Sequence, residues 1–372
     1  MIYFDHAATT PLDEQVLQKM LPYFTQTFGN PDSAHAYGRR AMAGVDAARD
    51  EIAAILKVKP KEIYFTSGGS EGNTWAIRQT VKARGGKHVI VGSTEHPSVL
   101  NCAGQLTEEG VDVTYLPVDE NGVASLSALE GALRKDTSLV AVMAGNNETG
   151  VLQPVERISA LLRPRGIHFH CDCVQTAGLY DLPVGIADSI SVSAHKFYGP
   201  KGVGFVYLKS GTAIRPLVNG GEQERGLRGG TTNVPGVVGM AEAFSRSQRA
   251  REGDKAHIAA LRDRLEERLL KEIGNVRISS RGADRLAGIS NVTFFGAQGT
   301  SLLFRLDSMG IAVSLGSACA SGSIGASHVL TAMGMSEKDA LSSVRFSFGR
   351  ENTAAEVDQT VSALKEILPS LR

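Results

Sequence analysis

The sequence predicts an α/β protein with a large, mainly parallel sheet domain and a smaller α+β unit. Between residues 60 and 210, short apolar runs alternate with amphipathic stretches, a pattern typical of a parallel sheet covered by helices. Residues 237–273 are rich in Ala, Leu, Arg and Glu with few breakers, which predicts one long helix bridging two units. The length of 372 residues allows about two domains.

The hydrophobic pattern sets the order of the elements. Seven strands are expected at 62–66, 88–91, 111–116, 139–144, 168–173, 189–193 and 203–208, because these runs are short, apolar and bounded by turn residues. Helical patterns lie between the earlier strands, at 71–83, 98–109, 125–134 and 155–162. After the long helix, strands are expected at 291–295, 312–314 and 344–348, a helix at 300–309 and a final helix from residue 354.

The domain boundaries follow from this order. Residues 16–250 are assigned to the large domain. The first 15 residues are too short to fold alone, so residues 1–15 are assigned with 251–372 to the smaller unit.

Composition limits the classes of function. The 39 Lys and Arg residues balance 39 Asp and Glu residues, and no long basic block occurs, so nucleic acid and anionic membranes are not expected as main partners. No apolar run approaches the length of about 18 residues that a transmembrane helix needs. The N-terminus lacks the pattern of a signal peptide. Four cysteines form no disulfide framework and fit the reducing cytoplasm.

Lys196 lies in the run SAHKFYGPKG at 193–202, just past an expected buried strand. Desolvation disfavours the ammonium form of lysine, and a neutral amine condenses with carbonyl compounds. Lysine is also the residue that binds pyridoxal phosphate (PLP) covalently. The run therefore indicates a PLP site, with an ordinary lysine at a strand end as the alternative.

A glycine-rich segment, TSGGSEGN at 66–73, follows a strand and opens a helix. Glycines let the backbone approach an anion, and the amides and dipole of a helix start favour phosphate. The hydroxyl of Ser70 adds a donor. The spacing matches neither a Walker loop nor a dinucleotide fingerprint. The alternative is a plain strand–helix turn with Ser70 as its N-cap.

The strand HFHCDCVQ at 168–175 carries an acid at its C-terminal end. Because side chains alternate along a strand, His170, Asp172 and Val174 share one face. A carboxylate at that edge of an α/β sheet lies where ligands bind and can keep a pyridinium nitrogen protonated. A metal site that includes Cys171 and Cys173 is the weaker alternative, because no second Cys/His cluster follows.

Two polar residues follow other strands. His96 has a flat ring that can stack on a ligand and a pKa near neutrality that suits proton transfer. Asn147 follows the strand at 139–144. Either residue is structural unless the remaining segments supply a ligand.

The last two segments carry a thiol and a cation. Cys319 lies in SLGSACASGS at 314–323, where small residues predict an exposed loop, and an exposed thiol in such a loop is interpreted as reactive. Arg345 lies inside an otherwise apolar strand, so its charge needs a partner. That partner is either a substrate carboxylate held by two hydrogen bonds or a protein acid.

Together the segments resemble the PLP-dependent cysteine desulfurases of fold type I, in the NifS/IscS-like group of the class V aminotransferases. The resemblance runs from DHAATT at 5–10 to RFSFGR at 345–350. It includes FGNP at 28–31, EH at 95–96, NNE at 146–148, SAHK at 193–196 and GSAC at 316–319. It implies a fold type I PLP-transferase whose small domain carries the cysteine loop.

The resemblance implies a cofactor site. Lys196 would bind PLP covalently, Asp172 would bind the ring nitrogen, and His96 would stack on the ring. Further contacts to the cofactor would come from Gly69, Ser70, Asn147, Gln175, Ser193, His195 and, from a second subunit, Thr231. A site completed by a second subunit implies a homodimer.

The resemblance also implies a reaction. Lys196 and His96 would transfer protons, Arg345 with Asn147 would bind the substrate, and Cys319 would take the sulfur of L-cysteine as a persulfide while L-alanine leaves. A sulfur-acceptor protein, such as an iron–sulfur scaffold or a tRNA or cofactor thiolation partner, would follow. No C-terminal scaffold-docking extension follows Arg372, so delivery to a scaffold stays open.

Three alternatives remain at this stage. Two are PLP enzymes on the same fold, namely a selenocysteine lyase and another class V aminotransferase. The third is a non-catalytic thiol or metal carrier that uses Cys171, Cys173 and Cys319.

Overall fold

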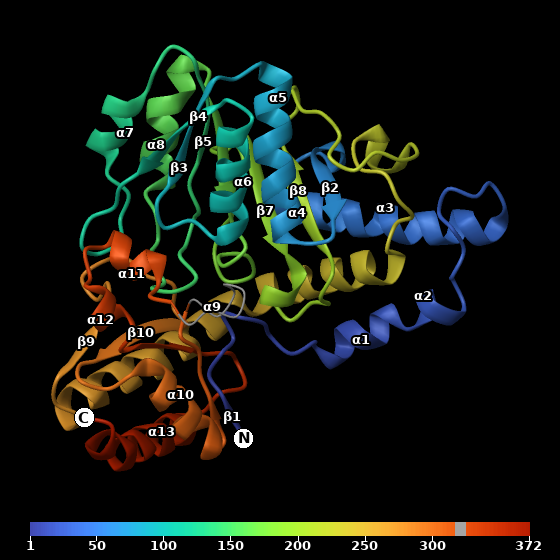
Figure 1. The fold of residues 1–372 in the computed structure, drawn as a ribbon. Helices are drawn as coiled ribbons and strands as arrows, with labels where there is room; N and C mark the ends of the chain where they lie inside the picture. The colour runs from blue at the N-terminus through green and yellow to red at the C-terminus, as the bar shows by residue number, and fades with distance from the viewer. Residues whose placement is uncertain (317–324) are drawn as a thin grey trace.

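A seven-stranded sheet forms the centre of the computed structural model, which describes residues 1–316 and 325–372 (Figure 1). Its order is β2-β8-β7-β6-β5-β3-β4. The strands are β2 (Ile63–Thr66), β3 (His88–Gly92), β4 (Asp112–Leu116), β5 (Thr137–Ala141), β6 (His168–Asp172), β7 (Ser189–Ser193) and β8 (Gly204–Leu208). Only β8 runs antiparallel to its neighbours. The predicted mainly parallel α/β fold is confirmed.

Helices cover both faces of the sheet, and the alternation of side chains explains why. On β3, Val89 and Val91 pack toward the π-helical turn Trp75–Gln79, α5 (Thr80–Arg84) and α6 (Pro97–Glu108). Ile90 points the other way, into a core shared with α3 (Ala36–Leu56), α7 (Leu126–Ala132), α8 (Val155–Leu162) and α9 (Val234–Glu272). Helix α4 (Gly69–Thr74) lies against β7 and β8. Both faces are apolar, as a covered parallel sheet requires.

A smaller unit lies beside the sheet domain. It has an antiparallel sheet of β9 (Val276–Ile278), β10 (Ile289–Phe294) and β12 (Ser343–Ser347), and a parallel pair of β1 (Ile2–Tyr3) and β11 (Ile311–Ala312). The helices α10 (Gly299–Ser308), α11 (His328–Ala332), α12 (Glu337–Ala340) and α13 (Ala354–Ile367) accompany these strands. The second half of α9 contributes Ile258, Leu265 and Leu269 to their core. The exact domain boundaries stay a prediction.

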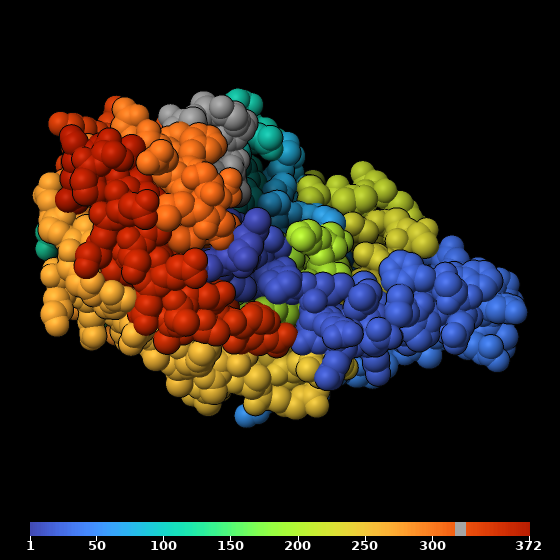
Figure 2. Space-filling view, turned by 90° about the horizontal axis from the view of Figure 1, so that it is seen from below, coloured from blue at the N-terminus to red at the C-terminus, as the bar shows by residue number. Residues whose placement is uncertain are grey.

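The N-terminal segment connects the two units. It follows β1 along β12 through a bridge between Asp5 and Ser347. It then reaches the sheet domain, where Thr10 Oγ1 donates to the carbonyl of His195 at 2.9 Å. Figure 2 shows this dark blue segment between the red and orange C-terminal residues and the green residues of the sheet domain.

No helix or strand was expected in residues 16–59. They contain most of α1 (Glu14–Met20), all of α2 (Pro22–Thr25) and α3, which packs along α9. No helix in the part of the chain that the structure describes is both long and apolar enough to cross a membrane.

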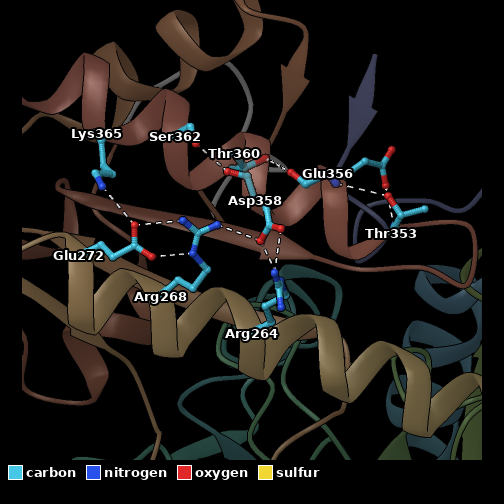
Figure 3. Close-up of polar contacts among 9 residues, drawn as sticks. All are labelled: Arg264, Arg268, Glu272, Thr353, Glu356, Asp358, Thr360, Ser362 and Lys365. Carbon is cyan, nitrogen blue, oxygen red and sulfur yellow. Dashed lines mark hydrogen bonds and ion pairs between the residues drawn. The ribbon is translucent and has the colours of Figure 1, made fainter.

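An ion-pair cluster joins α9 to α13 on the surface (Figure 3). Asp358 accepts from Arg264 at 2.7 Å and from Arg268 at 2.8 Å. Glu272 pairs with Arg268 at 2.6 Å and with Lys365 at 3.1 Å. We call these five residues the α9–α13 ion-pair cluster.

Candidate active site

A cavity of about 380 Å³ opens at the C-terminal ends of β6 and β7. Ligands bind at this edge in α/β sheets. The cavity collects ten of the residues predicted for the site: Gly69, Ser70, His96, Asn147, Asp172, Gln175, Ser193, His195, Lys196 and Arg345. Gly316, from the segment that carries the predicted cysteine, also lines it. A larger hollow of about 770 Å³, along Asp119, Pro154 and Lys255, holds none of them.

Lys196 ends a 3₁₀ turn, Ala194–Lys196, that follows β7 directly. This turn brings the side chain into the cavity. Its Nζ donates hydrogen bonds to the backbone carbonyls of Ala7 and Ala8, the latter at 2.9 Å. These two carbonyl oxygens orient the amine within the cavity.

Asp172 is the last residue of β6. Its Oδ1 accepts from the backbone N–H of Val174 at 2.9 Å, and its Oδ2 accepts from Asn73 Nδ2 at 2.6 Å. The carboxylate is 6% exposed and lines the cavity. Two donors and a buried setting fix its orientation.

His96 is the N-cap of α6 and lines the same cavity. Its Nδ1 accepts from the backbone N–H of Ser98 at 3.1 Å and lies 2.9 Å from the hydroxyl of Ser98. Burial lowers the pKa of His96, and the charge of Asp172 opposes this shift. Because Nδ1 accepts from Ser98, Nε2 is the nitrogen that carries the hydrogen of the neutral ring.

The cavity also holds groups suited to an anion. Helix α4 begins after Gly68 with no side-chain cap, so its first amides face no side-chain acceptor. A Cβ at Gly69 would lie 2.5 Å from Val174 Cγ2, which shows how closely the backbone approaches there. Ser70 and Ser193 add hydroxyl groups. The interpretation of Ser70 as N-cap is wrong, because Gly68 takes that position.

His195 lies at the same end of the site. Its Nδ1 is 3.2 Å from Thr9 Oγ1. Burial lowers the pKa of His195 to about 4, and Lys196 and Lys201 act in the same direction. The ring is therefore neutral near pH 7 and offers a hydrogen-bond donor rather than a positive charge.

These residues fit PLP. A lysine, a carboxylate for the ring nitrogen, an imidazole and an uncapped helix start with neighbouring hydroxyl groups all line one cavity. Gln175, whose Nε2 donates to Ala7 O at 2.7 Å, and Asn147 line it as well.

Arg345 has the protein partner that one interpretation expected. Its Nη2 donates to Asp5 Oδ1 at 2.8 Å and its Nη1 donates to the carbonyl of Asn147 at 2.8 Å. Its buried Nε has no hydrogen-bond partner among the described residues. The residue lines the cavity, and its guanidinium has N–H donors beyond these two contacts that could serve a ligand.

One predicted residue does not line this cavity, and another lies outside the described residues. Thr231 is exposed and does not line the cavity of its own chain. Cys319 lies outside the described residues, which resume at Gly325. Gly316, the last described residue before that segment, lines the cavity.

The cysteines considered for a metal site are buried. Cys171 and Cys173 pack in the large apolar core and are not in disulfides. Burial raises the pKa of Cys171 well above its usual value. No group of three or more His, Cys, Asp or Glu side chains suited to a metal occurs among residues 1–316 and 325–372.

Sequence reasoning missed three polar residues of the site. Asn73 ends the glycine-rich segment 66–73, and Ser98 follows His96 by two residues. Their only signal in the sequence is a place at the start of an expected helix, beside the edge of the sheet where a ligand is expected. Asp5 gave no signal, because it pairs with Arg345 across 340 residues of sequence.

Comparison with known proteins is consistent over the whole chain. Residues 2–360 match the family described as aminotransferase class-V. The chain is 42% identical to the cysteine desulfurase IscS of Methanosarcina thermophila, covering 100% of this chain and 93% of that protein. It is 44% identical to the putative cysteine desulfurase IscS 1 of Bacillus subtilis, covering 100% and 99%.

Solved structures give the same result. A NifS-like protein matches with a TM-score of 0.93 at 37% identity, over 100% of both chains. SspA in complex with cysteine matches with a TM-score of 0.82 at 36% identity, over 95% of this chain and 100% of that chain.

Proposed function

The chain belongs to the aminotransferase class-V family of PLP-dependent enzymes, and on this premise we propose that it is a cysteine desulfurase. It converts L-cysteine to L-alanine and passes the sulfur through a persulfide on Cys319 to an acceptor protein, for iron–sulfur cluster assembly or thiolation. The observation that carries the proposal is the single cavity that joins Lys196, Asp172, His96 and Arg345. Full-length relatives that bear this activity in their names support it.

Lys196, Asp172 and the anion-binding end of the cavity would hold the cofactor. PLP, when bound, supplies an electron sink for the α-carbon of an amino acid. The amine of Lys196, oriented by two carbonyls, is the group that binds the cofactor and moves the α-proton. His96 exchanges protons at Nε2.

Arg345 binds the carboxylate of the substrate. Its Nε is the buried donor that lacks a partner among the described residues, and a charged carboxylate satisfies it. Asp5 holds the guanidinium in place from the other side. We expect Arg345→Lys to raise KM for L-cysteine more than it lowers kcat, because a lysine cannot bind Asp5 and the substrate carboxylate in the geometry of the guanidinium.

Cys319 is the nucleophile. Its thiolate forms a bond to the sulfur of L-cysteine, and the C–S bond of the substrate breaks. The electron pair of that bond stays on the carbon, which takes a proton and leaves as part of L-alanine. The other cysteines are poor candidates, since Cys102, Cys171 and Cys173 are buried and burial raises the pKa of Cys102 to about 11.

Incubation with L-cysteine tests the function. The expected result is alanine formation and a mass gain of one sulfur on the Cys319 peptide. Cys319→Ala is expected to bind PLP yet release no sulfide with a reductant, while the matched control Cys102→Ala keeps activity. Lys196→Ala is expected to lose the borohydride-reducible cofactor. Sulfide release by Cys319→Ala at the parent rate would reject the role of Cys319, and absence of alanine would reject the function.

The proposal includes a homodimer with shared sites. Apolar side chains on the arm formed by α1, α2 and the start of α3 are exposed, including Phe24 at 57% and Phe28 at 63%. Such a patch favours association. Thr231 would reach the phosphate of the partner's site. An equimolar mixture of Lys196→Ala and Thr231→Asp, each inactive alone, should regain activity, because one site of each mixed dimer is intact.

The proposal places the enzyme in the cytoplasm. The three cysteines of the described residues are unpaired and buried, as a reducing compartment allows. The division into residues 16–250 and residues 1–15 with 251–372 belongs to the same proposal. Limited proteolysis that releases fragments at quite different positions would contradict this division.

A further inference from the structure

A line of buried polar side chains lies beneath the cavity, on the face of β6 toward α4 and α6. His168 Nε2 lies 2.8 Å from Ser189 Oγ, which lies 2.9 Å from His170 Nδ1. His170 Nε2 is 3.0 Å from Asn73 Oδ1, and Asn73 Nδ2 is 2.6 Å from Asp172 Oδ2. We call these five residues the buried array. Each is at most 6% exposed.

The directions of these hydrogen bonds follow from Asp172. A carboxylate only accepts, so the NH₂ of Asn73 faces Asp172 and its carbonyl oxygen faces His170. His170 Nε2 therefore carries a hydrogen. Burial lowers the pKa of His170 to about 3, so the ring is neutral near pH 7 and Nδ1 accepts from Ser189. Ser189 in turn accepts from His168.

A branch of the array reaches His96. The second amide hydrogen of Asn73 points to Ser98 Oγ at 2.9 Å. Ser98 therefore donates its own hydrogen to His96 Nδ1 at 2.9 Å. Because the backbone N–H of Ser98 also points at that nitrogen, Nδ1 has no place for a hydrogen, and Nε2 carries it.

We propose that Asn73 is a positioning residue that fixes Asp172 and His96 together. One amide group orients the carboxylate that would bind the ring nitrogen, and through Ser98 it places the ring hydrogen of His96 on Nε2. The carboxylate of Asp172 sets the orientation of the amide, because a flipped amide would place its carbonyl oxygen against the carboxylate, and the N–H of His170 then satisfies the amide oxygen. The inference deepens the proposed function and rests on it.

The isosteric variant Asn73→Asp tests the proposal. It keeps the acceptor that faces His170 and replaces the donor that faces Asp172 with a second acceptor. We expect the apoprotein of this variant to bind PLP at least about tenfold more weakly than the parent. We also expect the pH midpoint of the visible absorption band of the bound cofactor to shift. Asn73→Ala should behave in the same way.

Ser98→Ala separates the effect of Asn73 on Asp172 from its effect on His96. It keeps the bond between Asn73 and Asp172, so PLP affinity should stay within about threefold of the parent. It removes the hydroxyl donor to His96, so the pH profile of turnover should shift. The charges that act on His96 are those of Asp172, Lys196 and His328, and all three are unchanged in this variant.

The outcomes are distinct. Parent-like PLP affinity and an unshifted absorption midpoint in Asn73→Asp would overturn the proposal, even if its melting temperature fell, because Asn73 would then be structural only. A loss of PLP affinity in Ser98→Ala equal to that in Asn73→Asp would also overturn it. The measurements of PLP affinity and of the absorption midpoint use no L-cysteine. Failure of the parent holoenzyme to form alanine from L-cysteine would instead reject the proposed function itself.

Discussion

The buried array and the α9–α13 ion-pair cluster each join five polar side chains, but they differ in their access to water. Every bond of the array is enclosed, and two of its members are neutral histidines. The cluster consists of charges that solvent reaches, with Asp358 40% exposed (Figure 3). A partner left alone in the array stays unsatisfied, whereas one left alone in the cluster is hydrated. Polar contacts of similar length therefore contribute unequally to the free energy of unfolding.

Replacement of His170 by leucine should have the largest effect. It leaves Asn73 Oδ1 without its donor and the hydroxyl hydrogen of Ser189 without its acceptor in an enclosed site, while Ser189 still accepts from His168. We expect a loss of about 2–4 kcal/mol in the free energy of unfolding of the apoprotein, together with weaker PLP binding. Urea unfolding and PLP titration measure the two effects. A variant as stable as the parent would remove the distinction between the array and the surface cluster.

Acid should weaken the buried array over a different pH range from that of the α9–α13 ion-pair cluster. Burial lowers the pKa of His168 to about 4, against the usual 6.5. The unfolded chain therefore takes up a proton as the pH falls below about 6.5, while the folded chain stays neutral down to about 4. Stability present above pH 6.5 is lost across this range, on the order of 3 kcal/mol for His168.

Unfolding in urea at pH 7, 5.5 and 4.5 measures this loss. His168→Gln should show a shallower decline with pH than the parent, because the residue that titrates is absent. Equal declines in the two proteins would show that His168 does not contribute to the acid response.

The surface cluster should respond at lower pH. Hydrogen bonds from Arg264 and Arg268 lower the pKa of Asp358 to about 2, and those from Arg268 and Lys365 lower the pKa of Glu272 to about 2. The stability that these pairs add is present above the unfolded pKa near 4 and is lost as the pH falls through about 2. The pH dependence of the stability of Asp358→Asn should depart from that of the parent only below about pH 4, where the parent loses the contribution of these pairs and the two stabilities converge.

Asp358→Asn at neutral pH should have the smallest effect. The pairs are exposed, so the melting temperature should fall by at most about 2 °C, and less at high salt. Turnover of L-cysteine should be unchanged, because the cluster lies on the small unit and does not line the cavity. A fall as large as that of His170→Leu would contradict the comparison.

Much of the site was predictable because its residues carry local signals. Lys196 follows a buried strand among small residues, and alternation along β6 places His170 and Asp172 on one face. Asn73 carried no such signal, since an asparagine near a helix start has many ordinary roles. Its role depends on partners that the fold brings together from 97 and 99 residues away.

The sequence alone determined the seven strands of the large sheet, the helices between the earlier ones and the chemistry of the lysine, because hydrophobic period and residue type are local properties. Only the tertiary structure decided that Asp5 holds Arg345, that the carbonyls of Ala7 and Ala8 receive Lys196, and that one amide joins Asp172 to His96. These contacts join segments far apart in the chain. Their geometry exists only after these segments have packed against one another, so no local pattern encodes it.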